Sequence, residues 1–183
     1  MSSDLAPIDH RTISKDVWSL LSGDWMLVTA GSTSAWNTMT ASWGGFAVAW
    51  NLDLAIALVR PSRYTYEFME KSEGFTLSFL REGMREALNV CGSKSGRDCD
   101  KAKEAGLTAR DFGSPSGSPR IAFEEARLVI ACRKVFAQDL AADSFVDRSL
   151  LREHYAKGDL HRLYAGAIEG AWATGPARDK RGR

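Results

Sequence analysis

Three short runs of residues decide the fold of this chain: Asn37-Thr-Met-Thr-Ala-Ser-Trp43, Phe46-Ala-Val-Ala-Trp50 and Leu54-Ala-Ile-Ala-Leu-Val-Arg60. The first run is rich in β-branched and small residues and ends at the Gly44-Gly45 pair. A turn-like Asn51-Leu-Asp53 separates the second run from the third. Short apolar runs bounded by turn residues are typical of strands in a barrel. We therefore expect three consecutive strands here.

Similar runs occur on both sides of this stretch. We expect further strands at Trp25–Ala30, Phe75–Phe79, Ala126–Phe136 and His161–Trp172. The alternation in Phe75–Phe79 predicts a half-buried strand. We expect short helices at Ser14–Leu21 (with Ser14 as N-cap and Gly23 as its stop), Thr65–Ser72, Arg85–Cys91 (stopping at Gly92), Asp98–Ala105 and Val146–Tyr155. The fold class is thus mainly β, or α+β, with a few short helices. One domain is expected over residues 1–173, followed by a disordered basic tail at 174–183.

The composition limits the function. The chain has 183 residues, of which 44% are hydrophobic and 26% charged, and its formal net charge is +1. A charge this small gives no bulk attraction to nucleic acids or to an anionic membrane. No apolar run is long enough to span a bilayer, and the N-terminus lacks the pattern of a secretory signal. Three cysteines without a short metal-ligand spacing indicate reduced, mostly buried thiols in a cytoplasmic protein.

Two basic turns could bind a phosphate. Arg60-Pro-Ser-Arg-Tyr-Thr65 lies where a strand passes into a helix, so free backbone N–H groups, two guanidinium groups and two hydroxyls would meet there. Gly92-Ser-Lys-Ser-Gly-Arg97 follows a second helix and combines small residues with Lys94 and Arg97. Each turn has a simpler interpretation, a Pro turn with a hydroxyl cap and a solvated Gly/Ser turn. The second is not a P-loop, because its order of residues differs. Two such turns in one neutral chain favour a shared dianionic phosphate.

The strand Asn37–Ser42 carries hydroxyls and an amide but hardly any large aliphatic residue. A strand that only filled a core would carry Val, Ile or Leu on at least one face. Its composition suits a backbone that lies against a flat heteroaromatic ring. Trp36, Trp43 and Trp50 could wall such a pocket, although a tryptophan also serves simply as core filling.

Other catalytic patterns are missing from the sequence. We find no G-x-S-x-G elbow, no H-E-x-x-H, no Walker A motif and no dinucleotide fingerprint. With only three histidines, we expect no metal site. His161 is the single candidate catalytic residue, because it heads the last strand; it could line a pocket or merely cap a strand edge.

Taken together, these segments resemble the flavin reductase-like family of FMN-binding split barrels, which includes flavoredoxin. The resemblance lies in the order of motifs from about residue 20 to residue 172: Trp25–Gly31, Asn37–Gly45, Val59–Phe68, Phe75–Phe79, Gly92–Asp98, Phe123–Leu128 and Asp159–Tyr164. Each motif is weak by itself. This chain departs from the pattern at Cys99, where a small residue is common, and at Gly166-Ala-Ile-Glu169, where relatives often carry Gly-Glu-Ile.

The resemblance implies a six-stranded split barrel, a homodimer and FMN near the subunit interface. It places Asn37, Thr38, Met39, Thr40, Ala41 and Ser42 beside the isoalloxazine ring. It assigns the phosphate and ribityl chain to Arg60, Ser62, Arg63, Tyr64 and Thr65, with Lys94 and Ser95 at the same end. Ser78 and Phe79 would complete the wall.

The resemblance also implies a reaction in which NAD(P)H passes a hydride to the flavin N5, with His161 as a contact for nicotinamide or flavin. The flavin performs the redox chemistry, so no acid or base side chain is required. Two alternatives remain open at this point. One is an FMN-containing, flavoredoxin-like electron carrier that exchanges electrons with a partner protein, and the other is a non-catalytic flavin- or tetrapyrrole-binding module.

Overall fold

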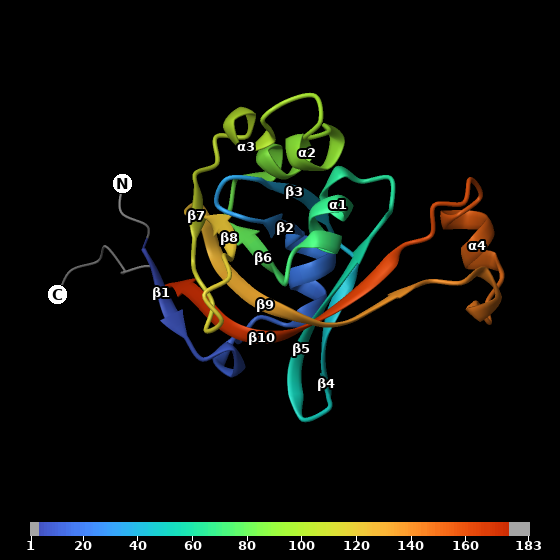
Figure 1. Cartoon of the computed structure of the whole chain (residues 1–183), viewed down its shortest axis with the longest axis horizontal. Helices are drawn as coiled ribbons and strands as arrows, with labels where there is room; N and C mark the ends of the chain where they lie inside the picture. Colours follow the sequence, from blue (N-terminus) through green and yellow to red (C-terminus); the bar gives the residue numbers. More distant parts are fainter. Residues whose placement is uncertain (1–3, 176–183) are drawn as a thin grey trace.

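The computed structural model describes residues 4–175, and its main element is an eight-stranded antiparallel sheet that curls into a barrel (Figure 1). Seven strands follow the order β3-β2-β6-β9-β10-β5-β4, and β1 pairs with β10. The strands of this sheet are β1 (Leu5–Ile8), β2 (Met26–Gly31), β3 (Trp36–Ala41), β4 (Gly44–Ala49), β5 (Leu52–Val59), β6 (Gly74–Leu80), β9 (Ala126–Asp139) and β10 (Arg162–Thr174). Two short strands, β7 (Ala109–Asp111) and β8 (Ile121–Phe123), form a separate pair.

The long strand β10 organises the sheet, because three strands pair with it. One edge pairs with β9 along nearly its whole length, and the other pairs first with β5 and then with β1. The β9–β10 register shifts twice, between Ala165 and Gly166 and between Ile168 and Gly170. Such bulges bend a sheet. At Gly166 a Cβ would collide with Phe75 and Cys132, so only glycine fits this close approach.

Alternate residues of the central strands fill the barrel. Val28, Leu77 and Ile130 are cross-strand partners on β2, β6 and β9, and none of them is exposed. They join one hydrophobic cluster with Phe75, Phe79 and other buried residues. The side chains that point out of the barrel on β2 and β9, such as Leu27 and Val129, belong to a second cluster beneath the helices.

The prediction of a half-buried strand at Phe75–Phe79 is wrong. All seven residues of β6 are buried, including Thr76 and Ser78 on the face that points out of the barrel. A second layer covers that face, and Thr76 Oγ1 donates a hydrogen bond of 2.5 Å to the carbonyl of Ile121 in β8. Sequence alternation reports polarity, whereas burial depends on what the chain later places against the strand.

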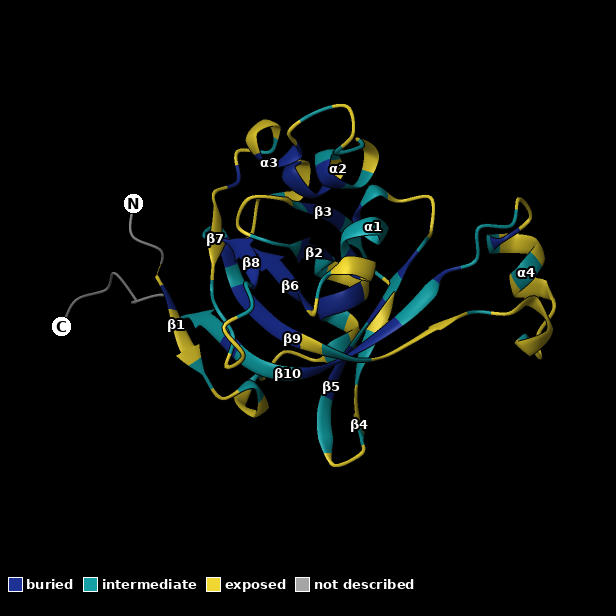
Figure 2. Cartoon of the chain, in the orientation of Figure 1, coloured by how far each residue is buried: buried dark blue, intermediate teal, exposed yellow. Residues whose placement is uncertain are grey.

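Short helices cover the barrel and one arm leaves it. Helix α1 (Tyr64–Lys71) follows β5, while α2 (Arg85–Ser93) and α3 (Lys101–Glu104) lie above β3 (Figure 1). Residues 140–161, here called the arm, connect β9 to β10 and carry α4 (Ser149–His154) away from the barrel. Figure 2 shows that much of α4 is exposed.

Several predicted boundaries require correction. The first helical segment spans residues 17–24, ending in a π-helical turn at Ser19–Asp24, and Asp16 rather than Ser14 accepts a hydrogen bond from the N–H of Ser19. Helix α2 continues past Gly92, and α4 is shorter than expected. The tight turn between β4 and β5 consists of Trp50 and Asn51, both with positive φ, so Leu52 and Asp53 already belong to β5.

The main sheet has eight strands rather than the six that the resemblance implied, because β1 and the long hairpin strands extend it. Thr174, expected in the tail, ends β10, and residues 176–183 of the expected tail lie outside the described residues. In the part of the chain that the structure describes, no helix has the length and apolarity needed to cross a membrane.

Candidate functional site

The polar strand β3 runs along the beginning of α1, and a buried hydrogen bond joins the two. Asn37 Nδ2 donates to Thr65 Oγ1 at 2.8 Å. The Gly92–Arg97 turn closes over the same place, where a Cβ on Gly96 would collide with Asn37 Oδ1. The structure thus brings together three segments that are separate in the sequence.

A cavity of about 290 Å³ opens at the end of β3. Its lining combines the second half of β3, the end of β5, the start of α1 and the start of β10: Met39, Thr40, Ala41, Ser42, Trp43, Leu58, Arg60, Arg63 and His161. Backbone, hydroxyl and guanidinium groups therefore face an aromatic and aliphatic wall. The volume lies near the lower end of the roughly 300–1,000 Å³ typical of ligand pockets.

His161 is nearly buried at the edge of this cavity. Its Nδ1 forms a hydrogen bond of 2.7 Å with the Tyr155 hydroxyl, and its ring centroid lies 5.1 Å from that of Trp43. Burial, reinforced by the nearby positive charge of Arg60, lowers the pKa of His161 to about 4. The imidazole is therefore neutral near pH 7. If Tyr155 is the donor, the proton of the ring resides on Nε2, which can then donate to a ligand.

The residues predicted to hold a phosphate gather at the start of α1, and each has a partner within the protein. Arg60 donates to the carbonyls of His154 and Asp159 at 3.0 and 2.9 Å. Ser62 donates through its N–H and its hydroxyl to the Asp159 carboxylate. Arg63 Nη1 donates to the Gly92 carbonyl at 2.9 Å, which ties α1 to the end of α2.

The second basic turn is braced by acidic residues. Lys94 pairs with Glu104, and Arg97 pairs with Glu67 while its guanidinium carbon lies 4.6 Å from the centroid of the Tyr64 ring. Ser95 Oγ accepts a hydrogen bond from the N–H of Arg97. These contacts fix the turn against α1, and the binding roles of Tyr64, Lys94 and Ser95 stay predictions.

Four other predicted site residues are buried more fully than residues that face a ligand need to be. Thr65, Ser78 and Phe79 are fully buried, and Thr38 is almost so, with its hydroxyl bonded to Thr29 and Val28. Ser78 Oγ is buried without a hydrogen-bond partner among the described residues. None of Thr65, Ser78 and Phe79 lines the cavity at the end of β3. Their predicted contacts with a cofactor are not tested by this geometry.

Sequence reasoning missed three groups around the site. Tyr155 and Asp159 reach it from the arm, while Lys101 lines a second cavity of about 360 Å³ beside Asn37, Thr38 and Tyr64. Burial lowers the pKa of Lys101, whose ammonium donates to the carbonyl of Cys91 at 3.1 Å. Asp159 begins the Asp159–Tyr164 motif of the resemblance, but nothing in the sequence assigned a contact to its carboxylate, and Lys101 resembled any solvated helix residue. Of the predicted tryptophans, Trp43 lines the first cavity, Trp36 lines the second, and Trp50 is exposed at a hairpin tip.

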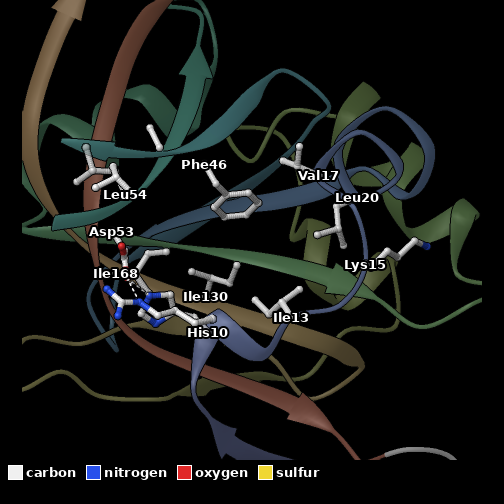
Figure 3. A pocket seen from close by; sticks show the side chains of 13 residues that line it. His10, Ile13, Lys15, Val17, Leu20, Phe46, Asp53, Leu54, Ile130 and Ile168 are labelled. Atoms are coloured by element: carbon white, nitrogen blue, oxygen red, sulfur yellow. Dashed lines mark hydrogen bonds and ion pairs between the residues drawn. The ribbon is translucent and has the colours of Figure 1, made fainter. Parts of the chain in front are cut away.

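A larger cavity of about 460 Å³ lies elsewhere, between the N-terminal segment and the β4–β5 hairpin (Figure 3). Its floor is apolar, with Phe46, Ile130 and Ile168 among the lining residues. Asp53 Oδ2 accepts hydrogen bonds of 2.7 Å from both His10 and Arg11 at its rim. His10 and Arg11 share this carboxylate, whereas Arg63 at the β3 site donates to a backbone carbonyl, so the β3 site suits a phosphate better.

The cysteines and other metal-ligating residues suggest no further chemistry. Cys91 and Cys132 are buried free thiols and Cys99 is partly buried. Burial raises the pKa of Cys91 to about 11, so its thiol is not a ready nucleophile. Within residues 4–175, no cluster of three or more His, Cys, Asp or Glu side chains could hold a metal ion.

The curled sheet, with short helices over one end, defines the class of protein: it is an FMN-binding split barrel by fold. The family model described as "Flavin reductase like domain" matches residues 18–181, and the chain belongs to this family. Family membership supports a flavin-related redox function.

Several solved structures share the fold. Flavoredoxin from Methanosarcina acetivorans is 21% identical with a TM-score of 0.63, and the match covers 82% of this chain and 68% of that one. An FMN-binding domain of flavin reductase-like enzymes from Shewanella baltica is 19% identical with a TM-score of 0.65, covering 95% and 79%. An NADH:FAD oxidoreductase from Streptomyces globisporus is 20% identical with a TM-score of 0.59, covering 87% and 82%. No curated protein matches the sequence.

Proposed function

We propose that the chain binds FMN in the cavity at the end of β3 and transfers a hydride from NAD(P)H to the flavin. The observation that carries this proposal is the shared lining of one cavity by residues 39–42 of β3, by Arg60 and Arg63, and by His161. The donor set fits FMN, because β3 offers backbone and hydroxyl groups to a ring edge while the start of α1 offers cations and N–H groups to a phosphate.

The residues of this chain have distinct parts in the proposal. Residues 39–42 orient the ring, and Arg63 holds the phosphate end while it stays anchored on the Gly92 carbonyl. Trp43 and Leu58 keep water from one wall. With Tyr155 as the donor to Nδ1, neutral His161 presents its Nε2–H to a nicotinamide amide or to the flavin edge. The bound flavin supplies the redox chemistry itself.

We also propose that the functional unit is a homodimer. Val48 and Trp50 are 75% and 63% exposed on β4 and its turn, and the Trp50 ring lies 6.0 Å from that of Phe136, which is 41% exposed. An exposed apolar patch of this kind marks a contact surface. The predicted cytoplasmic location is compatible with the free thiols.

An absorption spectrum tests the proposed function. The purified protein is incubated with FMN, freed of excess ligand, and then treated anaerobically with NADH and NADPH in separate experiments. Retained flavin absorbance that bleaches with either nucleotide supports the reductase. Retained absorbance that bleaches with neither would contradict hydride transfer and leave the electron carrier as the better explanation. A protein that binds no flavin would contradict both.

A further inference from the structure

We propose that Asp159 is a flavin-specificity residue: its carboxylate occupies the donors of Ser62 that would hold the FMN phosphate, so it selects against a flavin that carries a terminal dianion. This inference rests on the proposed function, because it concerns the same site. Because of this carboxylate, we expect the preference for FMN over riboflavin to be weaker than the basic turn would give without it.

The contacts of Asp159 imitate those of a bound anion. Its Oδ2 accepts a hydrogen bond of 2.6 Å from Ser62 Oγ, and its Oδ1 accepts one of 3.2 Å from the Ser62 N–H. Arg60 Nη1 lies 3.9 Å from Oδ2. A hydroxyl, a backbone N–H and a guanidinium at the start of a helix are the groups that bind phosphate oxygens. The carboxylate already accepts from both Ser62 donors, while Arg60 donates to the carbonyls of Asp159 and His154.

The arm backbone is shaped to deliver this carboxylate. Gly158 and Asp159 both adopt positive φ, 75° and 58°. The left-handed region is uncommon for a residue other than glycine, and it persists where surrounding contacts fix it. Arg60 supplies such a contact by donating to the Asp159 carbonyl at 2.9 Å. The side chain is therefore aimed at Ser62 by the main chain.

Anchoring of the arm is the competing explanation, but the arm has ties that do not need this carboxylate. Arg60 also donates to the carbonyl of His154, and the N–H of Leu140 donates to the carbonyl of His161. Of these ties, the Arg60 contact reaches the barrel, whereas the Leu140–His161 and Tyr155–His161 hydrogen bonds lie within the arm and hold its shape. Arg60 therefore still holds the arm backbone when the charge of Asp159 is removed, whereas that charge directly opposes a second anion at Ser62.

The phosphate of an entering FMN would come into contact with the negatively charged carboxylate of Asp159. It must displace the carboxylate from Ser62 or lie beside it, and like charges this close repel each other. Riboflavin lacks the phosphate and makes no such contact. Removing the charge should therefore strengthen FMN binding selectively.

The experiment compares the wild type with Asp159→Asn, which keeps the size and one acceptor oxygen but removes the charge. The matched control is Asp147→Asn, because Asp147 lies on the same arm and also accepts hydrogen bonds from the N–H and hydroxyl of a serine, Ser149. Dissociation constants for FMN and for riboflavin are measured by flavin fluorescence. We expect Asp159→Asn to bind FMN about tenfold or more tightly than the wild type, with riboflavin unchanged within about twofold. The control should change neither. Melting curves of all three proteins verify that they remain folded.

A second measurement uses inorganic phosphate alone and does not depend on flavin binding. Phosphate is titrated into ¹⁵N-labelled protein while the Ser62 amide signal is followed, with chloride at the same ionic strength as the reference. We expect the amide to respond at a lower phosphate concentration in Asp159→Asn than in the wild type. If no protein binds flavin but this difference is present, the proposed function fails and the competition stands. Unchanged or weaker FMN binding in folded Asp159→Asn, or equal phosphate responses, would overturn the role of Asp159.

Discussion

The Tyr155 hydroxyl and His161 Nδ1 lie 2.7 Å apart, and this hydrogen bond links two residues near the end of the arm at the edge of the cavity. Either partner can be the donor: the hydroxyl donates to a free Nδ1, or an Nδ1–H donates to the phenolic oxygen. Because burial lowers the pKa of His161 to about 4, the folded protein resists protonation of the ring. The burial of this ring therefore links the stability of the protein to pH.

The stability should fall as the pH falls from about 6.5 to about 4. The folded pKa of about 4 is lower than the ordinary 6.5, so the unfolded chain binds a proton that the folded chain refuses within this window. The full loss is on the order of 3 kcal/mol. Urea unfolding of wild type and His161→Asn, both without ligand, should give free energies whose difference changes by this order across the window. A pH-independent difference would contradict the prediction.

Replacing Thr65 by Val should destabilise the fold. The change removes the acceptor of Asn37 Nδ2 and leaves a buried amide without its partner, which costs about 1–3 kcal/mol. Chemical unfolding measures the loss. Thr33→Val, at an exposed position, is the matched control and should stay within about 0.5 kcal/mol of the wild type. Equal effects of the two substitutions would show that the Asn37–Thr65 bond contributes little.

Gly96→Ala should weaken both the fold and flavin binding. The new methyl group would collide with Asn37 Oδ1 and press on the Tyr64 ring, and overpacking of this kind costs roughly 1–3 kcal/mol. The displaced turn would also move away from the start of α1. Gly23→Ala is the control, because a Cβ there meets nothing within 4 Å. Thermal melts and FMN titrations measure the two effects. A Gly96→Ala variant that melts and binds FMN like the wild type would contradict the predicted close packing.

Arg63→Gln should reduce the affinity for FMN while riboflavin binding changes little. A hydrogen bond to a charged group contributes about 1.5–3 kcal/mol, which corresponds to a loss of roughly tenfold to a hundredfold. Arg148→Gln removes an arginine of the arm that is paired with Asp143, away from the cavity, and serves as the control. Fluorescence titrations distinguish the flavins. Equal losses for FMN and riboflavin would mean that Arg63 contacts the ring or supports the fold instead of the phosphate.

Trp50→Asn should shift the chain from dimer toward monomer. The substitution removes an exposed ring from the patch formed with Val48 and Phe136, and asparagine tolerates the positive φ of this turn position. Analytical ultracentrifugation over a range of concentrations measures the shift. Val146→Ser, at a fully exposed position on the arm, is the control. A wild-type chain that is monomeric at all concentrations would rule out the proposed dimer.

Much of the barrel could be predicted because its signals are local. The runs that became β2, β3, β4, β5, β6, β9 and β10 each carried strand-forming residues bounded by turns, and the Gly/Ser turn after α2 was visible in the same way. Strands β1, β7 and β8 were missed because they are short and depend on partners. Leu5–Ile8 is a strand because β10 offers it an unpaired edge.

The site was only partly predictable for the same reason. Residues 39–42, Arg60, Arg63 and His161 line one cavity, whereas Thr65 and Ser78 are buried away from it, and the binding roles of all of them stay predictions. Lys101 and Tyr155 had no recognisable motif around them, and the Asp159–Tyr164 motif did not indicate what the Asp159 carboxylate contacts. Their place in the site depends on contacts with segments that are distant in the sequence.

The sequence by itself determined the β-rich class, the succession of most strands along the chain and the two basic turns, since each depends on residues that are neighbours along the chain. Only the tertiary structure decided that both faces of β6 are covered and that Asp159 reaches Ser62, 97 positions away. The physical reason is that backbone preference and hydrophobic periodicity act locally, while burial and side-chain pairing arise when distant segments meet.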